Sequence, residues 1–307
     1  MESTFQNVIS PWREMLSWET LWAIRNATQK SITEMFAVLH ARLPSLALES
    51  ARQQELFDFQ EVENVIASYL EGRVSSGMSV CVDGAHHYPE GLRDASHRIA
   101  LFYYRGDPSL LESPRVSIVG ARECSSDGAT RAKRLARELS QLGYTIVSGL
   151  AKGIDTAAMK ATIDVGGLTI GVIGTPLDQV YPKENAGLQS FIAEQNLLIS
   201  HVPFYRYSQD HWRSRRYYFP QRNEVMASLS SATIIVEASE TSGTHTQARE
   251  CLKQGRKLFI LNSCFESGLT WPAAYEKRGA IRVRSTDDIL SALEVADHGG
   301  DEALESV

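Results

Sequence analysis

The sequence predicts an α/β fold in which a doubly wound, mostly parallel sheet follows a small helical N-terminal domain. Three observations support this prediction. Residues 1–71 contain no glycine and place apolar side chains at helical spacing. From residue 100 onward, short apolar runs alternate with helical stretches, as in βαβ units. These runs are almost continuously apolar, which is typical of parallel strands that helices cover on both faces.

The helical N-terminal domain is predicted over residues 1–75. Pro11 and Pro44 mark breaks between helices, and a further helix is predicted over residues 61–70. The apolar stripe of this region most simply forms a core, and we identify no chemistry in it.

The predicted α/β domain covers residues 76–296. Its strands are runs of four to seven apolar residues, several of which end in glycine or serine. The predicted strands are 115–120, 144–149, 168–174, 197–200, 232–237 and 257–261, and the predicted helices are 129–141, one that begins near residue 154, and 243–254.

Composition places the chain among globular proteins. Hydrophobic residues make up 43% of the 307 residues, which excludes disorder throughout. No run approaches the roughly 18 apolar residues of a membrane span, so we expect no membrane partner. The start of the sequence has no signal-peptide pattern. The four cysteines form no CxxC pair, which favours reduced thiols and a cytoplasmic location.

Charge is distributed unevenly along the chain, whose formal net charge is −6. Residues 1–100 carry 13 acidic and 8 basic side chains, and residues 101–296 carry 20 acidic and 23 basic ones. Residues 297–307 carry 4 acidic side chains and no basic one, and we expect them to form an acidic, flexible tail. A nucleic-acid partner is therefore not excluded, because binding depends on local charge.

Small and polar residues gather where three of the predicted strands end. Ligands of parallel sheets bind at this edge, where glycine permits close approach and helix N-termini attract anions. One glycine alone most simply makes a tight turn, but three such loops favour a phosphate-binding site. No GxGxxG or P-loop pattern is present, so we expect no cofactor. The candidate residues are Gly120, Arg122, Ser125, Ser148, Gly149, Lys152, Ser242, Gly243 and Thr244.

A second candidate site is the segment 205–222. It contains five arginines and six aromatic residues, but only one acidic residue, Asp210. Arginine pairs with phosphate, and aromatic faces stack on unpaired bases, so this composition indicates single-stranded nucleic acid. A surface loop whose aromatics close over the domain and whose arginines pair with acids is an equal alternative. The candidate contacts are Trp212, Arg213, Arg215, Arg216, Tyr217, Tyr218 and Phe219.

Residues 77–262 resemble the DNA-processing protein A family (DprA, also called Smf), in the family's order and near its spacing. The resemblance lies in the same loops and in the segments around them. The matching residues are Asp83, Tyr88-Pro89, Leu92, Leu101 to Asp107, Gly120 to Arg122, Ser125, Gly128, Ser148 to Asp155, Gly174 to Asp178, Tyr181-Pro182, Glu184-Asn185, Phe219-Pro220, Arg222-Asn223, Leu229-Ser230, Val236 to Ala238, Ser242-Gly243 and Gly255-Arg256.

The resemblance implies an extended Rossmann fold that binds and protects incoming single-stranded DNA. It also implies loading of a RecA-type recombinase in DNA uptake and recombination, usually as a homodimer, with no turnover chemistry. It adds Arg222 and Asn223 to the pocket. This chain departs from the family at Glu224, where many members have an arginine. We also expect it to lack the C-terminal winged-helix domain of many members.

Three classes of function stay open at this point. The first is a DNA-binding accessory protein, and the second is a divergent nucleotide sensor with a mobile-element or defence role. The third is an enzyme that cleaves nucleotides. Each group that could carry catalysis in such an enzyme has a simpler structural role, and none has metal-ligand spacing. We therefore expect no catalytic residue and no metal site. Those groups are Asp155, Asp178, Glu237 and His245.

Overall fold

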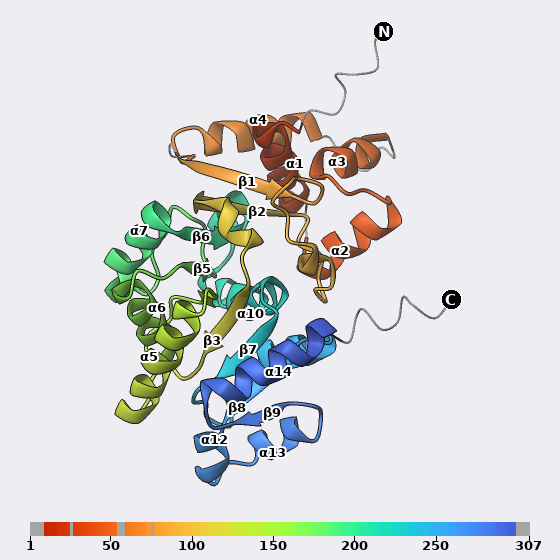
Figure 1. Ribbon diagram of the computed structural model, residues 1–307. Helices are drawn as coiled ribbons and strands as arrows, with labels where there is room; N and C mark the ends of the chain where they lie inside the picture. Colours follow the sequence, from red (N-terminus) through yellow and green to blue (C-terminus); the bar gives the residue numbers. More distant parts are fainter. Residues whose placement is uncertain (1–8, 25–26, 54–58, 75–76, 299–307) are drawn as a thin grey trace. The chain divides into compact units, whose positions relative to one another are not determined.

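The computed structural model describes residues 9–24, 27–53, 59–74 and 77–298, with side chains up to residue 294. The chain divides into two compact units, and each unit contains two separate stretches of the sequence. Figure 1 shows the helices and strands of both units. The first unit comprises Met1–Glu112 and Ile170–Val225, and the second comprises Ser113–Thr169 and Met226–Val307.

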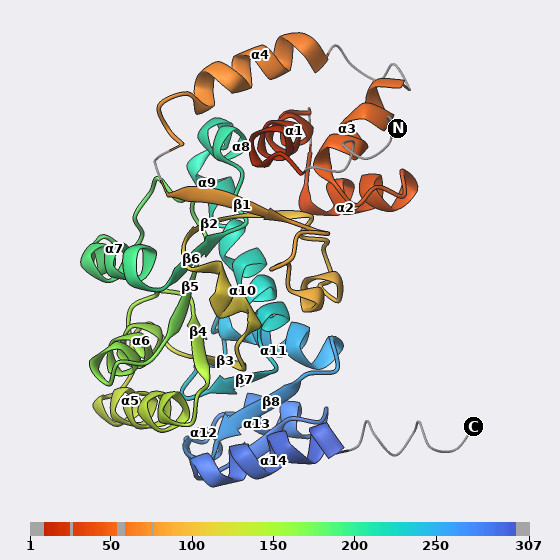
Figure 2. The same cartoon turned by 45° about the horizontal axis from the view of Figure 1, so that its top comes forward.

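Four N-terminal helices begin the first unit (Figure 2). Helix α1 starts at Ser10, whose side chain accepts the N–H of Arg13, and α2 starts at a reciprocal cap between Thr28 and Ser31. Trp18 of α1 is buried and packs edge-to-face against Phe36 of α2, and α1 also lies against β1 and β2. The helices are α1 (Pro11–Ala23), α2 (Gln29–Val38), α3 (Pro44–Gln53) and α4 (Phe59–Leu70).

The sheet of the first unit has the strand order β1-β2-β6-β5. Strands β5 and β6 are parallel, whereas β2 pairs antiparallel with both β1 and β6. The strands are β1 (Met78–Val82), β2 (Leu101–Gly106), β5 (Thr169–Ile173) and β6 (Leu197–Ser200). The remaining helical segments are η1 (Glu90–Arg93), η2 (Pro108–Glu112), η3 (Lys183–Asn185), α7 (Ala186–Gln195), α8 (Phe204–Gln209), α9 (Trp212–Arg215) and α10 (Tyr218–Leu229).

One buried carboxylate joins the N-terminal helices to this sheet. Glu19 of α1 is fully buried and accepts hydrogen bonds from the hydroxyl of Tyr103 in β2 and from the N–H groups of Phe204 and Tyr205 in α8. Burial raises the pKa of Glu19 to about 7, although these hydrogen bonds favour the charged form.

The second unit has an entirely parallel sheet in the order β4-β3-β7-β8-β9. Short loops connect its strands and helices. The strands are β3 (Arg115–Val119), β4 (Thr145–Ser148), β7 (Ala232–Ile235), β8 (Lys257–Leu261) and β9 (Ile281–Val283). The helices are α5 (Ser126–Gln141), α6 (Ile154–Asp164), α11 (Thr244–Lys253), α12 (Asn262–Glu266), α13 (Trp271–Glu276) and α14 (Thr286–His298).

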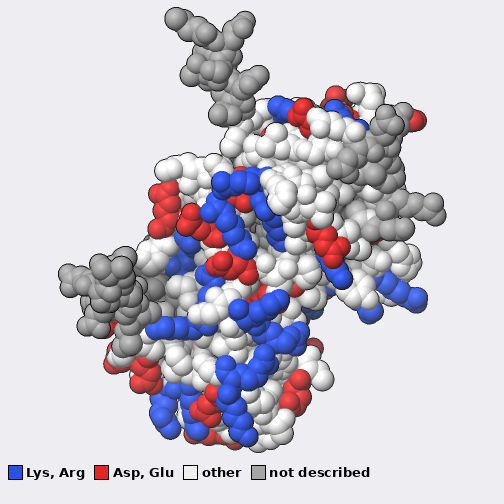
Figure 3. All heavy atoms as spheres, turned by 90° about the vertical axis from the view of Figure 1, so that its right-hand side faces the viewer, with Lys and Arg blue, Asp and Glu red and all other residues white. Residues whose placement is uncertain are grey.

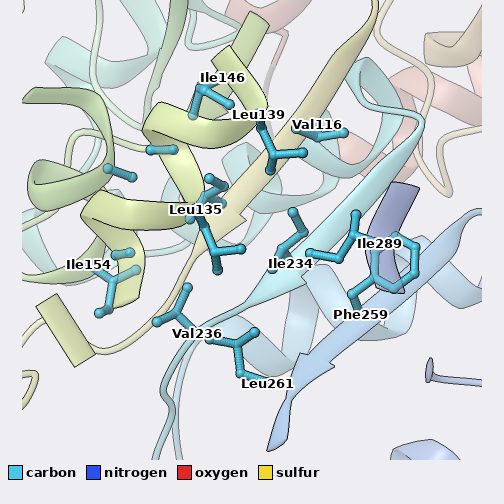
Figure 4. Packing of buried hydrophobic residues seen from close by; sticks show 14 of the residues in the cluster. Val116, Leu135, Leu139, Ile146, Ile154, Ile234, Val236, Phe259, Leu261 and Ile289 are labelled. Atoms are coloured by element: carbon cyan, nitrogen blue, oxygen red, sulfur yellow. The ribbon is translucent and has the colours of Figure 1, made fainter. Parts of the chain in front are cut away.

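Helices cover both faces of this sheet. On one face, α5, α6 and α14 pack their apolar side chains against strand residues such as Ile234 and Phe259 (Figure 4). On the other face, Thr233 of β7 accepts a hydrogen bond from Gln247 of α11 at 3.3 Å. Because neighbouring residues of β7 point to opposite faces, both faces are filled. The predicted doubly wound, mostly parallel α/β fold is confirmed.

The six predicted strands all occur, with ends that shift by at most two residues. Three strands lie outside the prediction, namely β1, β2 and β9. In the predicted tail, residues 297 and 298 end α14, and residues 299–307 lie outside the described part of the chain. Among the described residues, no helix has both the length and the apolar character needed to cross a membrane.

Candidate functional site

The loops after β3 and β7 lie where the direction of chain winding reverses. From β3 the chain moves through α5 to β4, and from β7 it moves through α11 to β8 on the opposite side. Nucleotides bind at this switch point in many doubly wound sheets. One hydrogen bond joins these two loops, from the N–H of Ala121 to the carbonyl of Glu237 at 2.7 Å. A second joins the loop after β3 to the start of α6, from the N–H of Ile154 to the carbonyl of Ala121 at 3.2 Å.

The carboxylate of Glu237 occupies the N-terminus of α5, where the sequence predicts a phosphate. The N–H of Ser125 donates to Oε1 at 2.8 Å, and the Ser125 hydroxyl donates to Oε2 at 2.6 Å. The same hydroxyl accepts the N–H of Gly128 at 2.9 Å. Arg131 lies 3.7 Å from Oε2. The chain's own anion therefore fills this position.

Two glycines make this arrangement possible. A Cβ at Gly120 would lie 2.7 Å from the carbonyl oxygen of Glu237 and 2.7 Å from the Ile154 side chain. A Cβ at Gly128 would overlap Oε2 of Glu237. The sequence identifies Gly120 as a close-approach position but does not indicate that the approaching group is Glu237. Ser125, a residue type that is preferred at the N-cap, is the sequence signal for the start of α5.

The loop after β4 also turns its polar groups inward. Ser148 is fully buried and donates its hydroxyl to the carbonyl of Ile118 at 2.8 Å. The N–H of Gly149 donates to Oδ2 of Asp155 at 3.1 Å, so the side chain of Asp155 reaches back from α6 to the loop after β4. Gly153, with φ +75°, occupies the cap position. Two cations predicted for the site are exposed, Arg122 and Lys152.

In the loop after β7, Ser242 acts on its own helix. Its Oγ accepts the N–H of Thr244 at 3.2 Å and donates to the hydroxyl of Thr244 at 2.9 Å. Gly243 is exposed and precedes α11. His245 stacks on Tyr275, with ring centroids 5.7 Å apart. Internal acceptors thus lie at the starts of α5 and α11, where the sequence predicts phosphates.

The segment 205–222 runs through α8 and α9 into the first turns of α10, and part of it faces solvent. Trp212 is 67% exposed and Tyr217 is 60% exposed. The guanidinium of Arg213 lies 5.1 Å from the ring centroid of Trp212, and that of Arg216 lies 5.4 Å from the ring centroid of Tyr217. Exposed aromatic faces beside guanidinium groups provide both stacking surface and positive charge.

Other members of the segment point inward. Tyr218 is buried and donates its hydroxyl to Asp210 at 2.8 Å. Arg215 lies over Tyr207 and donates to the carbonyl of Asp210 at 3.1 Å, and Phe219 packs near Tyr181. Each of the two alternatives therefore describes part of this segment. Some of its side chains close over the domain, and others remain exposed.

The two pocket residues that the resemblance adds belong to the first unit. Arg222 is 5% exposed and donates to the carbonyl of Val172 at 3.2 Å, while Asn223 is half-buried. Burial lowers the pKa of His201 to about 4, and the charge of Arg222 acts in the same direction. Glu224, the charge-reversed departure, is also buried. Its carboxylate pairs with His97.

Each of the four candidate catalytic groups contacts a partner that accounts for its position. Asp178 pairs with Arg73 at 3.1 Å, and the imidazole of His245 lies 2.9 Å from the carbonyl oxygen of Ser239. Asp155 and Glu237 serve the loops described above. Their partners agree with structural roles for all four groups.

One group of side chains could hold a metal ion, although the sequence indicated none. His86 and His87 follow β1, and Glu112 ends η2. Their ligand atoms lie within 4.8 Å of one another, and Nδ1 of His87 lies 2.7 Å from the carboxylate of Glu112. This group was missed from the sequence because His87 and Glu112 are 25 residues apart, which matches no recognised spacing of metal ligands.

Basic side chains gather in part of the surface that Figure 3 shows. Figure 3 shows one face of the molecule, on which Lys and Arg side chains gather with Asp and Glu side chains between them. A formal net charge of −6 is therefore compatible with local positive surface.

Comparison with known proteins places this fold and these loops in one family. A sequence model described as DNA recombination-mediator protein A matches residues 79–294. The DNA processing protein DprA of Streptococcus pneumoniae is 36% identical over 208 residues, which cover 67% of this chain and 71% of that protein. DprA of Bacillus subtilis is 31% identical over 237 residues, which cover 76% of each chain. Protein Smf of Escherichia coli is 34% identical over 218 residues, which cover 70% of this chain and 56% of that protein.

Solved structures agree with the sequence comparison. The crystal structure of DprA from Streptococcus pneumoniae superimposes with a TM-score of 0.70 at 27% identity, covering 92% of this chain and 98% of that one. DprA from Helicobacter pylori, whose structure was described for its single-stranded DNA binding mode, gives a TM-score of 0.59 at 26% identity and covers 71% of this chain and 96% of that one. The chain therefore belongs to the DNA recombination-mediator protein A family, which includes the DNA processing proteins DprA and Smf.

Proposed function

We propose that this protein binds single-stranded DNA in a DNA-processing role. The observation that carries the proposal is the pair of exposed aromatic rings, Trp212 and Tyr217, each with an arginine beside it. Family membership supports it, since a relative from Helicobacter pylori binds single-stranded DNA.

In the proposed mechanism, aromatic side chains contact the bases of the strand and basic side chains contact its phosphates. Bases stack on Trp212 and Tyr217, because stacking tolerates any sequence. Arg213 and Arg216, which are exposed beside these rings, pair with phosphates. In the second unit, Arg122 and Lys152 are exposed and offer further phosphate contacts.

A finer role follows from the family resemblance. We propose that the bound strand is protected and passed to a RecA-type recombinase in the cytoplasm, and that the protein acts as a homodimer without catalytic turnover. The test is recombinase assembly on a strand that a single-strand-binding protein already covers. Faster assembly in the presence of this protein supports the role, whereas an unchanged rate contradicts it.

The binding proposal is tested by fluorescence anisotropy with a labelled single strand, the matching duplex and a free nucleotide over a salt series. We expect the single strand to bind more tightly than the duplex at low salt. Trp212→Ala should weaken binding about 5- to 150-fold, the equivalent of about 1–3 kcal/mol per stacked base.

The matched control is Phe191→Ala, because Phe191 is 41% exposed on α7 in the same unit and plays no part in the proposed contacts. Equal losses in the two variants, or no preference for the single strand, would contradict the proposal. A free nucleotide that raises the melting temperature while oligonucleotides do not would favour the nucleotide sensor instead. The position of Glu237 at the switch point argues against that sensor.

A further inference from the structure

Three arginines of the first unit surround one buried carboxylate. Asp83 directly follows β1, and its side chain is 2% exposed. Its Oδ1 accepts hydrogen bonds from Arg42 Nη2 at 2.9 Å and from Arg93 Nε and Nη2 at 3.1 and 2.9 Å. Its Oδ2 accepts from Arg98 Nη2 at 2.7 Å. We call these four residues the Asp83 cluster.

The arginines come from separate parts of the unit and are held by more than Asp83. Arg42 lies between α2 and α3, Arg93 ends η1, and Arg98 lies shortly before β2. The guanidinium of Arg98 lies 5.4 Å from the ring centroid of Phe36, and that of Arg93 lies 5.7 Å from the ring centroid of Tyr88. Aromatic packing therefore fixes two of the three guanidinium groups.

The cluster carries more positive charge than its carboxylate neutralises. Three guanidinium groups carry three positive charges and offer about fifteen N–H donors. The carboxylate carries one negative charge and accepts four hydrogen bonds from them. Glu90 adds an ion pair to Arg93 at 3.2 Å, but its side chain is 86% exposed. Burial opposes ionisation of Asp83, and the hydrogen bonds of Arg42 and Arg93 outweigh this effect and lower its pKa.

Two of the arginines are accessible to a ligand. The side chain of Arg42 is 58% exposed and that of Arg93 is 40% exposed. One arginine would suffice to anchor Asp83, and three repel one another, so an additional anion would relieve the excess charge. The planar guanidinium fork matches the oxygens of a phosphate.

We propose that the Asp83 cluster is a second phosphate-binding site, at which Asp83 positions the guanidinium groups of Arg42 and Arg93 for the backbone of single-stranded DNA. This inference rests on the proposed function. The ligand is the phosphodiester group itself, so the site contributes affinity without sequence preference.

The test measures the salt dependence of binding to an oligonucleotide of about 30 nucleotides, which is longer than the usual site of about 4–16 nucleotides. Each lost phosphate contact should reduce the slope of log K against log salt by about 0.7. We expect that reduction for Arg42→Gln and separately for Arg93→Gln, with affinity about two- to fivefold lower at low salt. Arg42→Lys keeps the charge and should keep the slope.

The matched control is Arg13→Gln, which removes the same charge from a side chain of the same unit that is 64% exposed and lies 3.9 Å from Glu49. If both cluster variants keep the wild-type slope, as the control does, the inference is wrong while the proposed function stands. A loss of affinity with an unchanged slope also contradicts it, because that loss reflects altered structure. A wild-type protein that binds no single strand refutes the proposed function, and the inference with it.

Discussion

The start of α5 allows a sharp test of the role assigned to Glu237. Gly128 and Gly187 both lie in the first turn of a helix, and neither has a positive φ. Helix propensity alone therefore predicts that alanine stabilises each position by up to about 1 kcal/mol. Their surroundings differ, because a Cβ at Gly187 meets nothing within 4 Å, whereas one at Gly128 overlaps Oε2 of Glu237.

The magnitude follows from the bonds that Gly128→Ala would break. To make room, the carboxylate of Glu237 must leave the N–H of Ser125 at 2.8 Å and its hydroxyl at 2.6 Å. Hydrogen bonds to a charged group contribute about 1.5–3 kcal/mol each, but the released carboxylate regains water. We expect a net destabilisation of about 1–3 kcal/mol for Gly128→Ala, against a small stabilisation for Gly187→Ala.

Chemical denaturation of the two variants measures this difference in the free energy of unfolding. A double-mutant cycle isolates the cause: in a Glu237→Ala background, Gly128→Ala should cost nothing, because the overlapping oxygen is gone. The reasoning is refuted if Gly128→Ala is as stable as Gly187→Ala, or if its cost persists without Glu237.

Three further predictions concern single side chains. Lys152→Glu should weaken single-strand binding in anisotropy titrations and make the affinity less dependent on salt. Lys160→Glu, which reverses the charge of an exposed lysine on α6, should not. Equal effects of the two substitutions would show that Lys152 is not part of the interface. Because the folded-state pKa of Glu19 is raised to about 7 from 4.5, the stability that this group contributes is fully present below about pH 4.5 and is lost as pH rises through 7. We expect wild type to lose up to about 3 kcal/mol more stability between pH 5 and pH 8 than Glu19→Gln does, as measured by denaturation at each pH; equal losses would contradict the assignment. Gly120→Ala should lower the melting temperature, because its Cβ would lie 2.7 Å from a carbonyl oxygen and an isoleucine side chain; an unchanged melting temperature would show that the two loops separate easily.

The parallel part of the fold could be predicted from sequence because each strand is a continuous apolar run followed by a helix. Strand β9 is only three residues long, which is too short for a pattern to be recognised. Strands β1 and β2 pair antiparallel, and their partners are set by contacts distant in sequence. Periodicity reports which face of an element is buried but does not report which neighbour buries it.

The candidate site was predictable at the level of loops, but not at the level of individual atoms. Gly120 after β3 correctly indicates close approach at the carboxyl edge of the sheet, whereas a Cβ at Gly243 after β7 would meet nothing within 4 Å. Sequence could not show that Glu237, 112 residues from Ser125, would supply the anion. It also could not show that Ser148 is buried within the sheet while Trp212 is exposed, because burial depends on tertiary packing.

The discontinuity of both units has a consequence for the order of events during synthesis. The first unit needs residues up to Val225, and the second continues beyond that point, so neither is complete when residue 169 leaves the ribosome. Until Phe204 and Tyr205 are made, Glu19 lacks two of its three hydrogen-bond donors. The N-terminal helices therefore cannot complete their packing until a segment almost two hundred residues later is made. Before then, the side chain of Glu19 lacks the backbone donors of that segment.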